Sequence, residues 1–424
     1  MKRLLGSILK LGAGEAVSKL AGFAFYGYVS RAFGVELLGI VALSQTVAGF
    51  VMMGTDLGLR LIGARLVARD ANLAPAIIPQ VVKKRLLSCA VCVSLASIYA
   101  LWGPVPAGAR LYVLGFTLGV LPYAFSLDWL AWGLNHFGWL GVWRGGVGLL
   151  FAFGAIAAIR ASGFSLLPIT IANAASGVLG VIVLWALWRY RWQPSLSIPK
   201  QDTAEMDHQF RWGAVLPLGA ATILNLMFNN FDTVMLGAMT SAAEVGRYNA
   251  AYKILFAILG GYYLLTQSLY PKLSRMQGGR TARQFLSYAL VAVGVLGGCI
   301  ALAVAIWAAP ILHAIYGADL NAAYLLRVLA FALPIDFCTS LLAITMISWG
   351  YDRHVLACMG SAAGVNVLLN FFLIPRLHAA GSAWATLASY VYLLLVLGAV
   401  SLLKPGFFEK PVCAPNPEAA INPA

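Results

Sequence analysis

Charge is scarce in this chain of 424 residues, and negative charge is the scarcer sign. Lysine, arginine, aspartate and glutamate together make up 10% of the residues, with 29 basic against 15 acidic side chains, while hydrophobic residues make up 61%. Soluble domains carry about 25% charged residues. Together with a mean hydropathy of +0.83, this composition excludes an ordinary water-soluble protein and predicts a chain that lies mostly within a lipid bilayer.

Motifs for catalysis and cofactor binding are missing as well. The sequence has no GxxxxGK[ST] phosphate-binding loop, and its five histidines are scattered without metal-ligand spacing. Of the six cysteines only Cys89 and Cys92 are close together, inside a hydrophobic run where ordinary helix packing is the expected role. No segment between hydrophobic runs is long enough for a catalytic domain. We therefore expect no enzymatic activity, no metal and no cofactor.

Hydrophobic runs of about 20 residues dominate what is present. Each is long enough to cross the hydrocarbon core as a helix, and lipid offers no partners to open backbone groups, so an all-α membrane protein follows. The first run contains charged residues and is too long for a cleavable signal peptide. The twelve expected spans are 8–32, 36–60, 84–103, 109–131, 138–160, 166–189, 213–238, 246–270, 284–308, 323–349, 355–374 and 379–402.

The basic residues predict the orientation of these spans. About nineteen lysines and arginines fall on the side that holds the N-terminus, Arg85 among them, against five on the opposite side. Cytoplasmic loops carry such an excess, so both termini are expected in the cytoplasm. The net charge of +14 is thereby explained by topology, because the basic residues lie in short loops between spans, and nucleic acid is not expected as a partner.

The two halves of the chain resemble one another. Residues 33–50 align with 240–258, which places Gly39 opposite Gly246, and Trp-Gly pairs end the fourth span of each half. An even number of spans per half gives parallel repeats related by an axis along the membrane normal. The expected organisation is an N-terminal six-helix lobe (1–189), a cytoplasmic linker (190–212), a C-terminal six-helix lobe (213–404) and a disordered cytoplasmic tail (405–424).

Ionisable residues inside the spans predict a polar interior, because such groups are costly in lipid and usually face a partner or a watery cavity. Glu15 and Lys19, and likewise Asp56 and Arg60, are four residues apart with the acid first. Each pair could therefore simply neutralise itself along one helix face. Arg31, near a helix end, could extend to the membrane surface.

Four segments carry a resemblance to a known family. They are SRAFGVELLGIVAL (30–43), MGTDLGL (53–59), NNFDTVMLGAMTSAAEVGRYNAAYKI (229–254) and ILHAIYGADLNAAYLLRVLAFALP (311–334). Their order and spacing are similar to those of the Wzx-type O-antigen and polysaccharide flippases, in the MOP superfamily that also contains the MATE transporters. The first contains that family's Arg-x-x-Gly-x-x-x-x-Gly pattern, at Arg31, Gly34 and Gly39.

The resemblance implies transfer of an undecaprenyl-pyrophosphate-linked oligosaccharide from the cytoplasmic to the periplasmic leaflet by alternating access. It also implies coupling to H⁺ or Na⁺ in some members, and a polysaccharide polymerase or assembly protein is a candidate partner. A MATE-like drug or cation antiporter is the nearest alternative, disfavoured by the excess of intramembrane cations. A membrane glycan polymerase or ligase is another, disfavoured by the short outward loops.

The candidate site residues follow from the chemistry of such a substrate. Cations suit its diphosphate and amides suit its sugar hydroxyls, while a carboxylate could bind a coupling ion. Arg144 and Lys253 have no carboxylate at helical spacing and are the strongest candidates. The full set is Lys19, Arg31, Arg60, Arg144, Lys253, Arg327, Asn229 and Asn366 for substrate, with Glu15 and Asp56 for ion coupling.

Overall fold

The computed structural model describes residues 2–162, 166–193, 210–276, 279–317 and 320–403. All of the regular secondary structure in these ranges is helical. The helices are α1 (Lys2–Asp56), α2 (Leu59–Arg69), η1 (Ala71–Leu73), α3 (Ala74–Trp102), η2 (Ala107–Ala109), α4 (Arg110–Leu118), η3 (Leu121–Phe125), α5 (Asp128–Gly133), α6 (Phe137–Ser162), α7 (Leu166–Leu187), η4 (Trp188–Trp192), α9 (Trp212–Met239), α10 (Ala242–Met276), α11 (Gly279–Ile306), α12 (Ala308–Tyr316), α13 (Ala323–Ala330), α14 (Ala332–Ser348), α15 (Asp352–Leu377) and α16 (Ala379–Leu403).

Each of the twelve expected spans coincides with helical structure. Within the described ranges, nine helical stretches are long and apolar enough to cross a bilayer. The first of them, Lys10–Asp56, is 47 residues long and supplies two spans because it contains a kink. α9 and α10 are not among the nine but coincide with the spans expected at 213–238 and 246–270. The prediction of an all-α protein with about twelve spans is confirmed.

Glycine at position 34 produces the kink of α1. Its backbone has φ 84° and ψ −176°, a combination that is essentially restricted to glycine. The chain therefore turns back between the first span, up to residue 33, and the second span, from residue 35 to Asp56. The two parts are called here the first and second spans of α1.

The fourth span of each half is interrupted near a proline. In the N-terminal half, α4, η3 and α5 divide the span expected at 109–131, and Pro122 lies in η3. In the C-terminal half, a break at Phe331 separates α13 from α14, whose first turn contains Pro334. Proline cannot donate the backbone hydrogen bond of a helix interior, which explains breaks at these positions.

The start of the third span differs from the expectation. It was expected at residue 84, after a basic loop, but α3 begins at Ala74, with proline in its first turn. Proline is well tolerated there because the first N–H groups of a helix have no intrahelical partner. Arg85 is consequently inside a helix and fully buried, so its assignment to a cytoplasmic loop was wrong.

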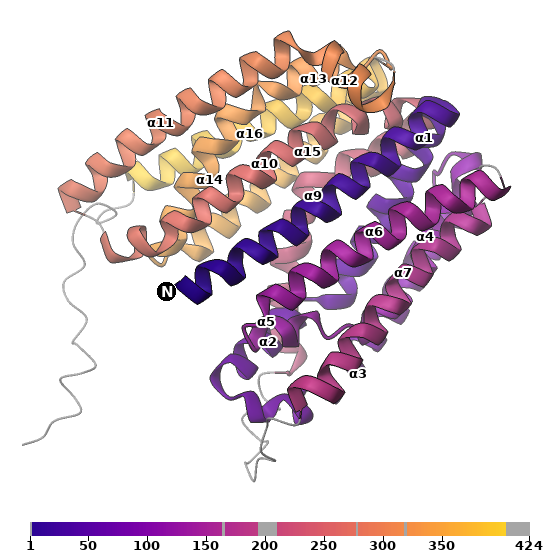
Figure 1. The fold of residues 1–424 in the computed structure, drawn as a ribbon. Helices are drawn as coiled ribbons and strands as arrows, with labels where there is room; N and C mark the ends of the chain where they lie inside the picture. Colours follow the sequence, from indigo (N-terminus) through magenta and orange to yellow (C-terminus); the bar gives the residue numbers. More distant parts are fainter. Residues whose placement is uncertain (1, 163–165, 194–209, 277–278, 318–319, 404–424) are drawn as a thin grey trace, which may run out of the picture.

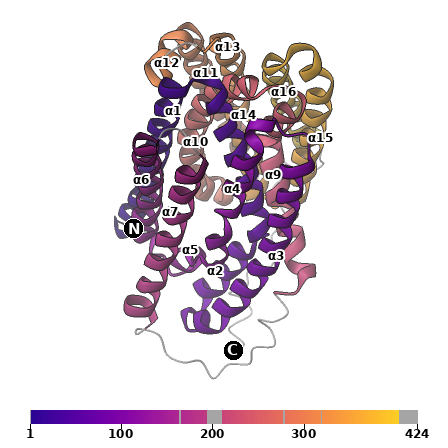
Figure 2. The same ribbon diagram turned by 90° about the vertical axis from the view of Figure 1, so that its right-hand side faces the viewer.

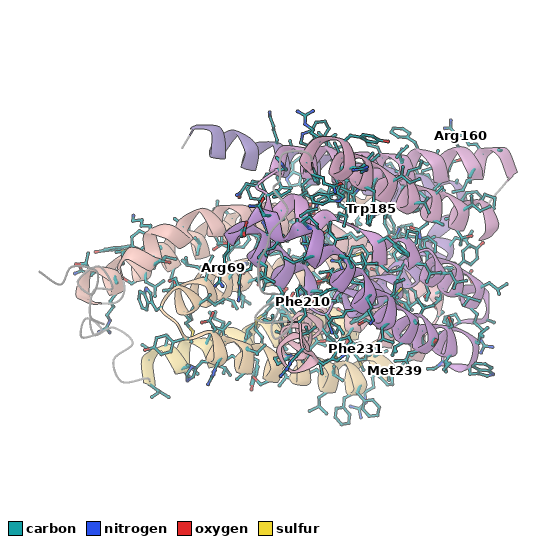
Figure 3. The ribbon with its side chains drawn as sticks, turned by 90° about the horizontal axis from the view of Figure 1, so that it is seen from below. Arg69, Arg160, Trp185, Phe210, Phe231 and Met239 are labelled. Atoms are coloured by element: carbon teal, nitrogen blue, oxygen red, sulfur yellow. The ribbon has the colours of Figure 1, made fainter. Side chains whose placement is uncertain are left out.

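The helices form two lobes that meet along α1. Figure 1 shows α2 to α7 on one side of α1 and α10 to α16 on the other, with the lobes close together near α12 and diverging toward the N-terminus. Turned by 90°, α12 and α13 lie at one end of the bundle and α2 and α5 at the other (Figure 2). Arg69 and Arg160 mark these opposite ends of the N-terminal lobe in Figure 3. The described part of the predicted linker (190–193 and 210–212) adjoins α7 and α9; the rest of it and the tail lie outside the described residues.

Equivalent glycines of the two halves touch at the lobe interface. A Cβ added to Gly39 would lie 1.8 Å from the carbonyl oxygen of Ala242, and one added to Gly246 would lie 2.0 Å from that of Val35. Each glycine thus faces the carbonyl four residues before the other glycine. This reciprocity is what a two-fold relation between parallel repeats produces, and it agrees with the alignment of Gly39 with Gly246.

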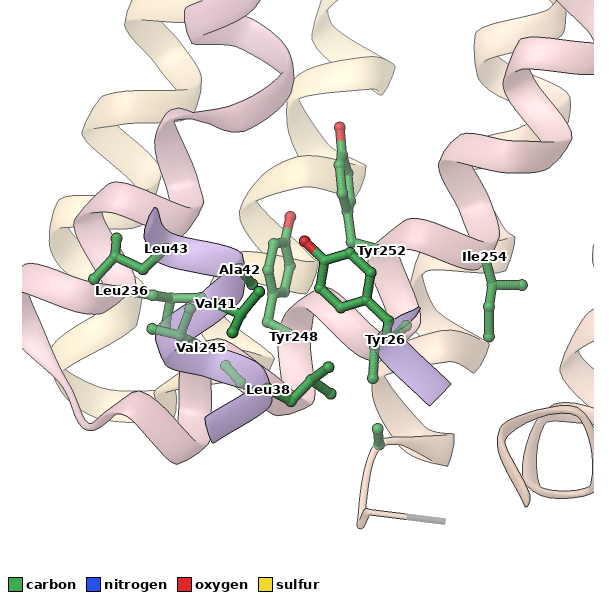
Figure 4. Packing of buried hydrophobic residues seen from close by; sticks show 14 of the residues in the cluster. Tyr26, Leu38, Val41, Ala42, Leu43, Leu236, Val245, Tyr248, Tyr252 and Ile254 are labelled. Carbon is green, nitrogen blue, oxygen red and sulfur yellow. The ribbon is translucent and has the colours of Figure 1, made fainter. Parts of the chain in front are cut away.

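The core of the molecule runs through this interface. Tyr26, Leu38 and Leu43 of α1 pack with Leu236 of α9 and Val245 of α10 in one buried cluster. Figure 4 shows these side chains interleaved. Two further buried clusters fill the end of the N-terminal lobe near α2 and the interior of the C-terminal lobe around α14.

Candidate substrate-binding site

Two lysines lie where the first span of α1 faces α10. The Lys253 Nζ on α10 sits 4.0 Å from the centre of the Tyr26 ring, and the Lys19 Nζ on α1 sits 5.7 Å from that of Phe256. Lys19 also lies close against the backbone of Gly260. Within the described residues neither lysine has a carboxylate within 4 Å, whereas aromatic faces contact both. Such cation–π contacts compensate only part of the lost hydration.

A buried carboxylate with neutral partners lies within the C-terminal lobe, between α9, α10 and α16. Asp232 of α9 accepts hydrogen bonds from the Tyr248 hydroxyl, from Thr386 Oγ1 at 3.3 Å and from the Thr233 N–H at 2.8 Å. Asp232 is 2% exposed. No lysine or arginine in the described ranges pairs with it, so hydroxyl and amide donors alone stabilise its charge.

Asn229 extends this polar region by one turn of α9. Its carbonyl oxygen accepts from the Tyr252 hydroxyl at 2.5 Å, and its Oδ1 accepts from the Tyr390 hydroxyl at 3.4 Å. Tyr252 in turn stacks on Tyr248, with ring centroids 5.5 Å apart. Asn229 is therefore joined to α10, the helix that also carries Lys253.

Asn366 lies away from this region, within the C-terminal lobe. Its Oδ1 accepts from Asn370 Nδ2 at 3.0 Å, and Asn370 Oδ1 accepts from Ser382 Oγ at 2.8 Å. Both asparagines are at most 2% exposed. Asn370 thus joins α15 to α16 and Asn366 supports it from the same helix, so the structure places Asn366 in helix packing.

The expected pair of Glu15 with Lys19 is wrong. Glu15 Oε2 lies 2.9 Å from Arg144 Nη1 on α6, and Lys19 points instead toward α10. Gly14 and Gly141 let the backbones of α1 and α6 approach very closely. Glu15 is therefore closer to a side chain of the neighbouring helix than to Lys19 on its own helix. Arg144, expected to be unpaired, therefore has a carboxylate partner.

The expected pair of Asp56 with Arg60 is replaced by a four-residue ion network. Arg85 of α3, 0% exposed, bonds to Asp56 and lies 3.7 Å from Asp128 Oδ1. Arg60 Nε lies 3.3 Å from Asp128 Oδ2, and only its backbone N–H contacts Asp56. The network has two charges of each sign and joins α1, α2, α3 and α5. Its balance favours a structural role for Asp56 and Arg60.

Arg31 and Arg327 both lie exposed at the end of the bundle opposite to the N-terminus. Arg31 Nη2 donates to the Ala314 carbonyl at 2.6 Å, across the lobe interface, and Arg327 Nε donates to the Ala305 carbonyl at 3.3 Å. Of the eight predicted substrate-binding residues, Lys19 and Lys253 lie at the same contact between α1 and α10, and Asn229 on α9 is hydrogen-bonded to α10.

Sequence reasoning missed Arg85 and the hydroxyl groups around Asp232. Arg85 follows Lys83 and Lys84, and three adjacent basic residues resemble a loop. The four-residue spacing from Tyr248 to Tyr252, one turn of α10, was a signal that could have placed both tyrosines on the face of Asp232 and Asn229. In the described residues no group of three or more His, Cys, Asp or Glu side chains could hold a metal ion.

Solved structures with this fold are membrane transporters. The lipid II flippase MurJ in an inward closed conformation has a TM-score of 0.68 at 12% identity, covering 93% of this chain and 87% of that one. A multidrug resistance MATE transporter of the MOP superfamily has a TM-score of 0.69 in its inward-facing conformation, at 14% identity, covering 94% of this chain and 100% of that one. An outward-facing conformation of such a transporter has a TM-score of 0.58, also at 14% identity, with 95% and 96% covered.

The family comparison covers more than half of the sequence. Residues 4–277 match the model of the family described as polysaccharide biosynthesis protein. No curated protein sequence matches this chain. The solved structures named above are of transporters and a flippase, which agrees with the expectation that the chain is not an enzyme. The chain belongs to the polysaccharide biosynthesis protein family and has the fold of the MOP transporter superfamily, as its sequence predicts.

Proposed function

We propose that this protein is a flippase that moves an undecaprenyl-pyrophosphate-linked oligosaccharide from the cytoplasmic to the periplasmic leaflet of a bacterial inner membrane. The observation that carries the proposal is the placement of Lys19 and Lys253, two cations without carboxylate partners in the described part of the chain, where the two lobes face each other. The family match and the MurJ-like fold support the same class of function.

The chemistry of the lysines suits a diphosphate. An anion that leaves water needs fixed positive charge to replace its hydration, and that charge is most effective where the surroundings are apolar. Arg60, Arg85 and Arg144 are already neutralised by carboxylates. Lys19 and Lys253 retain unbalanced charge, so they are the residues that an incoming diphosphate would contact.

The neighbouring polar region suits a sugar. Asn229 would present its amide to a sugar hydroxyl, and the buried Tyr252 and Tyr390 hold it in place through their hydroxyl groups. The polyprenyl tail would remain in lipid throughout, so only the diphosphate and the glycan would pass between the lobes.

The direction of transport follows from the orientation proposed from the basic loops. With the N-terminus in the cytoplasm, the lobes are in contact at the periplasmic end and diverge on the cytoplasmic side (Figure 1). The higher TM-score with an inward-facing than with an outward-facing transporter supports this assignment. The structure would then represent the state that receives substrate from the cytoplasmic leaflet.

Coupling to an ion gradient, if used, would fall on a carboxylate without a basic partner. Glu15 and Asp56 are paired with Arg144 and Arg85. In the described part of the chain, Asp232 has hydroxyl and backbone N–H partners and Asp336 has the Ser340 Oγ at 3.5 Å, and neither has a basic partner. We therefore propose Asp232 and Asp336, in place of Glu15 and Asp56, as the residues that would bind H⁺ or Na⁺.

A deletion strain tests the function. We expect loss of surface glycan, accumulation of lipid-linked repeat units on the cytoplasmic leaflet and unchanged sensitivity to cationic dyes and drugs. Normal surface glycan with new drug sensitivity would support the MATE-like antiporter instead, provided that no second flippase is expressed. Complementation with the intact gene is the control.

A further inference from the structure

The Arg-x-x-Gly-x-x-x-x-Gly pattern at Arg31, Gly34 and Gly39 assembles on one contact between the lobes. Arg31 ends the first span of α1, Gly34 forms the kink, and Gly39 lies at the start of the second span. The partners of Arg31 and Gly39 are both in the C-terminal lobe. Arg31 and Gly39, on either side of the Gly34 kink, thus meet the other lobe at one end of the bundle.

The glycine crossing leaves no room for side chains. The positions of an added Cβ, 1.8 Å from the Ala242 oxygen and 2.0 Å from the Val35 oxygen, are far below any tolerated contact. The obstructing atoms belong to backbone, so they cannot rotate away. Glycine lets two helices approach to backbone contact, and any other residue would hold them apart.

Arg31 forms the second element of the contact. It donates to the Ala314 carbonyl at 2.6 Å, among the last four carbonyls of α12, which lack intrahelical partners. A cation is favourable at that end of a helix. A Cβ on Gly27 would lie 2.6 Å from the carbonyl oxygen of Ile315, so α1 lies directly against the same helix end.

Helix α12 is firmly held by the C-terminal lobe. The buried Tyr316 hydroxyl donates to the Ala250 carbonyl of α10 at 3.1 Å. Gly317, with φ 81°, ends α12 and donates its N–H to the His313 carbonyl at 2.9 Å. A cation of one lobe therefore contacts a helix end that moves with the other lobe.

We propose that the Gly39–Gly246 crossing and the contact of Arg31 with α12 together form the outer gate of this transporter. The proposal rests on the proposed function, because a gate has a role only if the lobes alternate. The gate is closed in this structure and has to separate when the protein opens to the opposite side. The family's Arg-x-x-Gly-x-x-x-x-Gly pattern then serves to close the gate. Arg31 favours the closed state over the open state and makes no contact with substrate.

Labelling of a buried cysteine tests the gate. Ala42, on the second span of α1, is 1% exposed and lies at the interface drawn in Figure 4. Ala42→Cys should react slowly with a membrane-impermeant maleimide in sealed vesicles whose outer face is opposite to the N-terminus. The same protein without Ala42→Cys corrects for the native cysteines.

Gly39→Ala and Gly246→Ala should each increase the labelling rate of Ala42→Cys roughly tenfold, which corresponds to a shift of about 1.4 kcal/mol in the equilibrium. Gly49→Ala and Gly261→Ala are matched controls on the same two helices, since a Cβ at either position meets nothing within 4 Å. If Gly39→Ala and Gly246→Ala both label at the parental rate, the proposal that the glycine crossing closes the gate is wrong.

Arg31→Ala keeps the test decisive if the glycine variants do not accumulate, because it removes no buried packing. It should also raise labelling, whereas Arg327→Ala, which removes an exposed arginine bonded within its own lobe, should not. Equal labelling in both arginine variants would refute the role of Arg31. Labelling needs no substrate, so it tests the gate independently of the proposed function. If the variants raise labelling as expected but deletion of the gene leaves surface glycan intact, the proposed function fails and the gate does not.

Discussion

Paired and unpaired charges occupy different places in this molecule. Four of the five ion pairs among the described residues join neighbouring helices within the N-terminal lobe, as Glu15 does with Arg144 and Arg85 with Asp56, and the fifth joins Arg247 to Glu244 on α10. The unpaired lysines lie between the lobes. Residues of one chemical type therefore divide into structural and substrate-facing groups according to their neighbours, and substitution should separate the two groups.

Lys253→Ala should reduce flipping strongly while leaving the amount of membrane protein nearly unchanged, because it removes a cation without stranding a carboxylate. Lys253→Arg should keep part of the activity if the role is electrostatic. Surface glycan normalised to immunoblotted protein is the measurement. The exposed Lys83→Ala is the control, and full activity of Lys253→Ala would show that the diphosphate binds elsewhere.

Asp56→Ala should destabilise the N-terminal lobe, because it leaves the fully buried Arg85 without its nearest partner. Removing one member of a buried ion pair costs about 3–5 kcal/mol. Thermal unfolding of purified protein and membrane protein level should both report the loss. The double change Asp56→Ala with Arg85→Ala should recover much of it, since Arg60 and Asp128 remain paired. The exposed Glu36→Ala should have little effect, and a stable single variant would contradict a structural network.

The sequence was informative about which residues are unusual and much less about their partners. Six residues stand out as charges within apolar runs, and all take part in ion pairs or cation–π contacts: Glu15, Lys19, Asp56, Arg60, Arg144 and Lys253. Their partners depend on which helices touch, and close glycine contacts such as Gly14 with Gly141 decide that. A spacing of four along one helix cannot reveal a carboxylate on the next.

At the scale of helices, the lengths of the hydrophobic runs predicted the positions of nearly all the spans. Eleven of the twelve expected spans start within about six residues of a helix or kink boundary in the described ranges. The exception is α3, whose start was expected after the basic residues Lys83, Lys84 and Arg85. Its first turns pack Ala74, Ile77, Ile78 and Val81 into the buried cluster near α2, a tertiary contact that the basic residues after them obscure in the sequence.

Gly34→Ala should damage the junction of the two α1 spans. The backbone there, φ 84° and ψ −176°, costs a residue with a side chain about 1–3 kcal/mol. We expect a lower unfolding temperature and less protein in the membrane. Gly22→Ala, in the helical first span with nothing within 4 Å of its Cβ, should be neutral or slightly stabilising. Equal stability of both variants would show that the kink is not required.

At the scale of the whole molecule, the sequence anticipated two lobes but not their conformational state. Duplication and span number predicted parallel repeats, whereas the end at which the lobes close depends on backbone contacts such as Gly39 with Gly246. The orientation in the membrane is predicted from the basic loops.

Reporter fusions or cysteine labelling should determine the orientation. Sites at 196–206 and 278–282 should report the cytoplasm, and sites at 105–109 and 318–322 should report the periplasm, because of the roughly fourfold excess of basic residues on one side. A periplasmic report from 196–206 would reverse both the orientation and the direction of transport proposed here.

The reciprocal contact of Gly39 and Gly246 has a consequence for the origin of the chain. Where equivalent positions of two repeats touch each other on a two-fold axis, the interface is isologous, as in a symmetric homodimer. A single six-span ancestor with the same membrane orientation would have met its own copy through one glycine. Gene fusion then needed only to connect the end of one copy to the start of the next on the same side of the membrane, and the later divergence placed the buried ion network in one half and the unpaired Asp232 in the other.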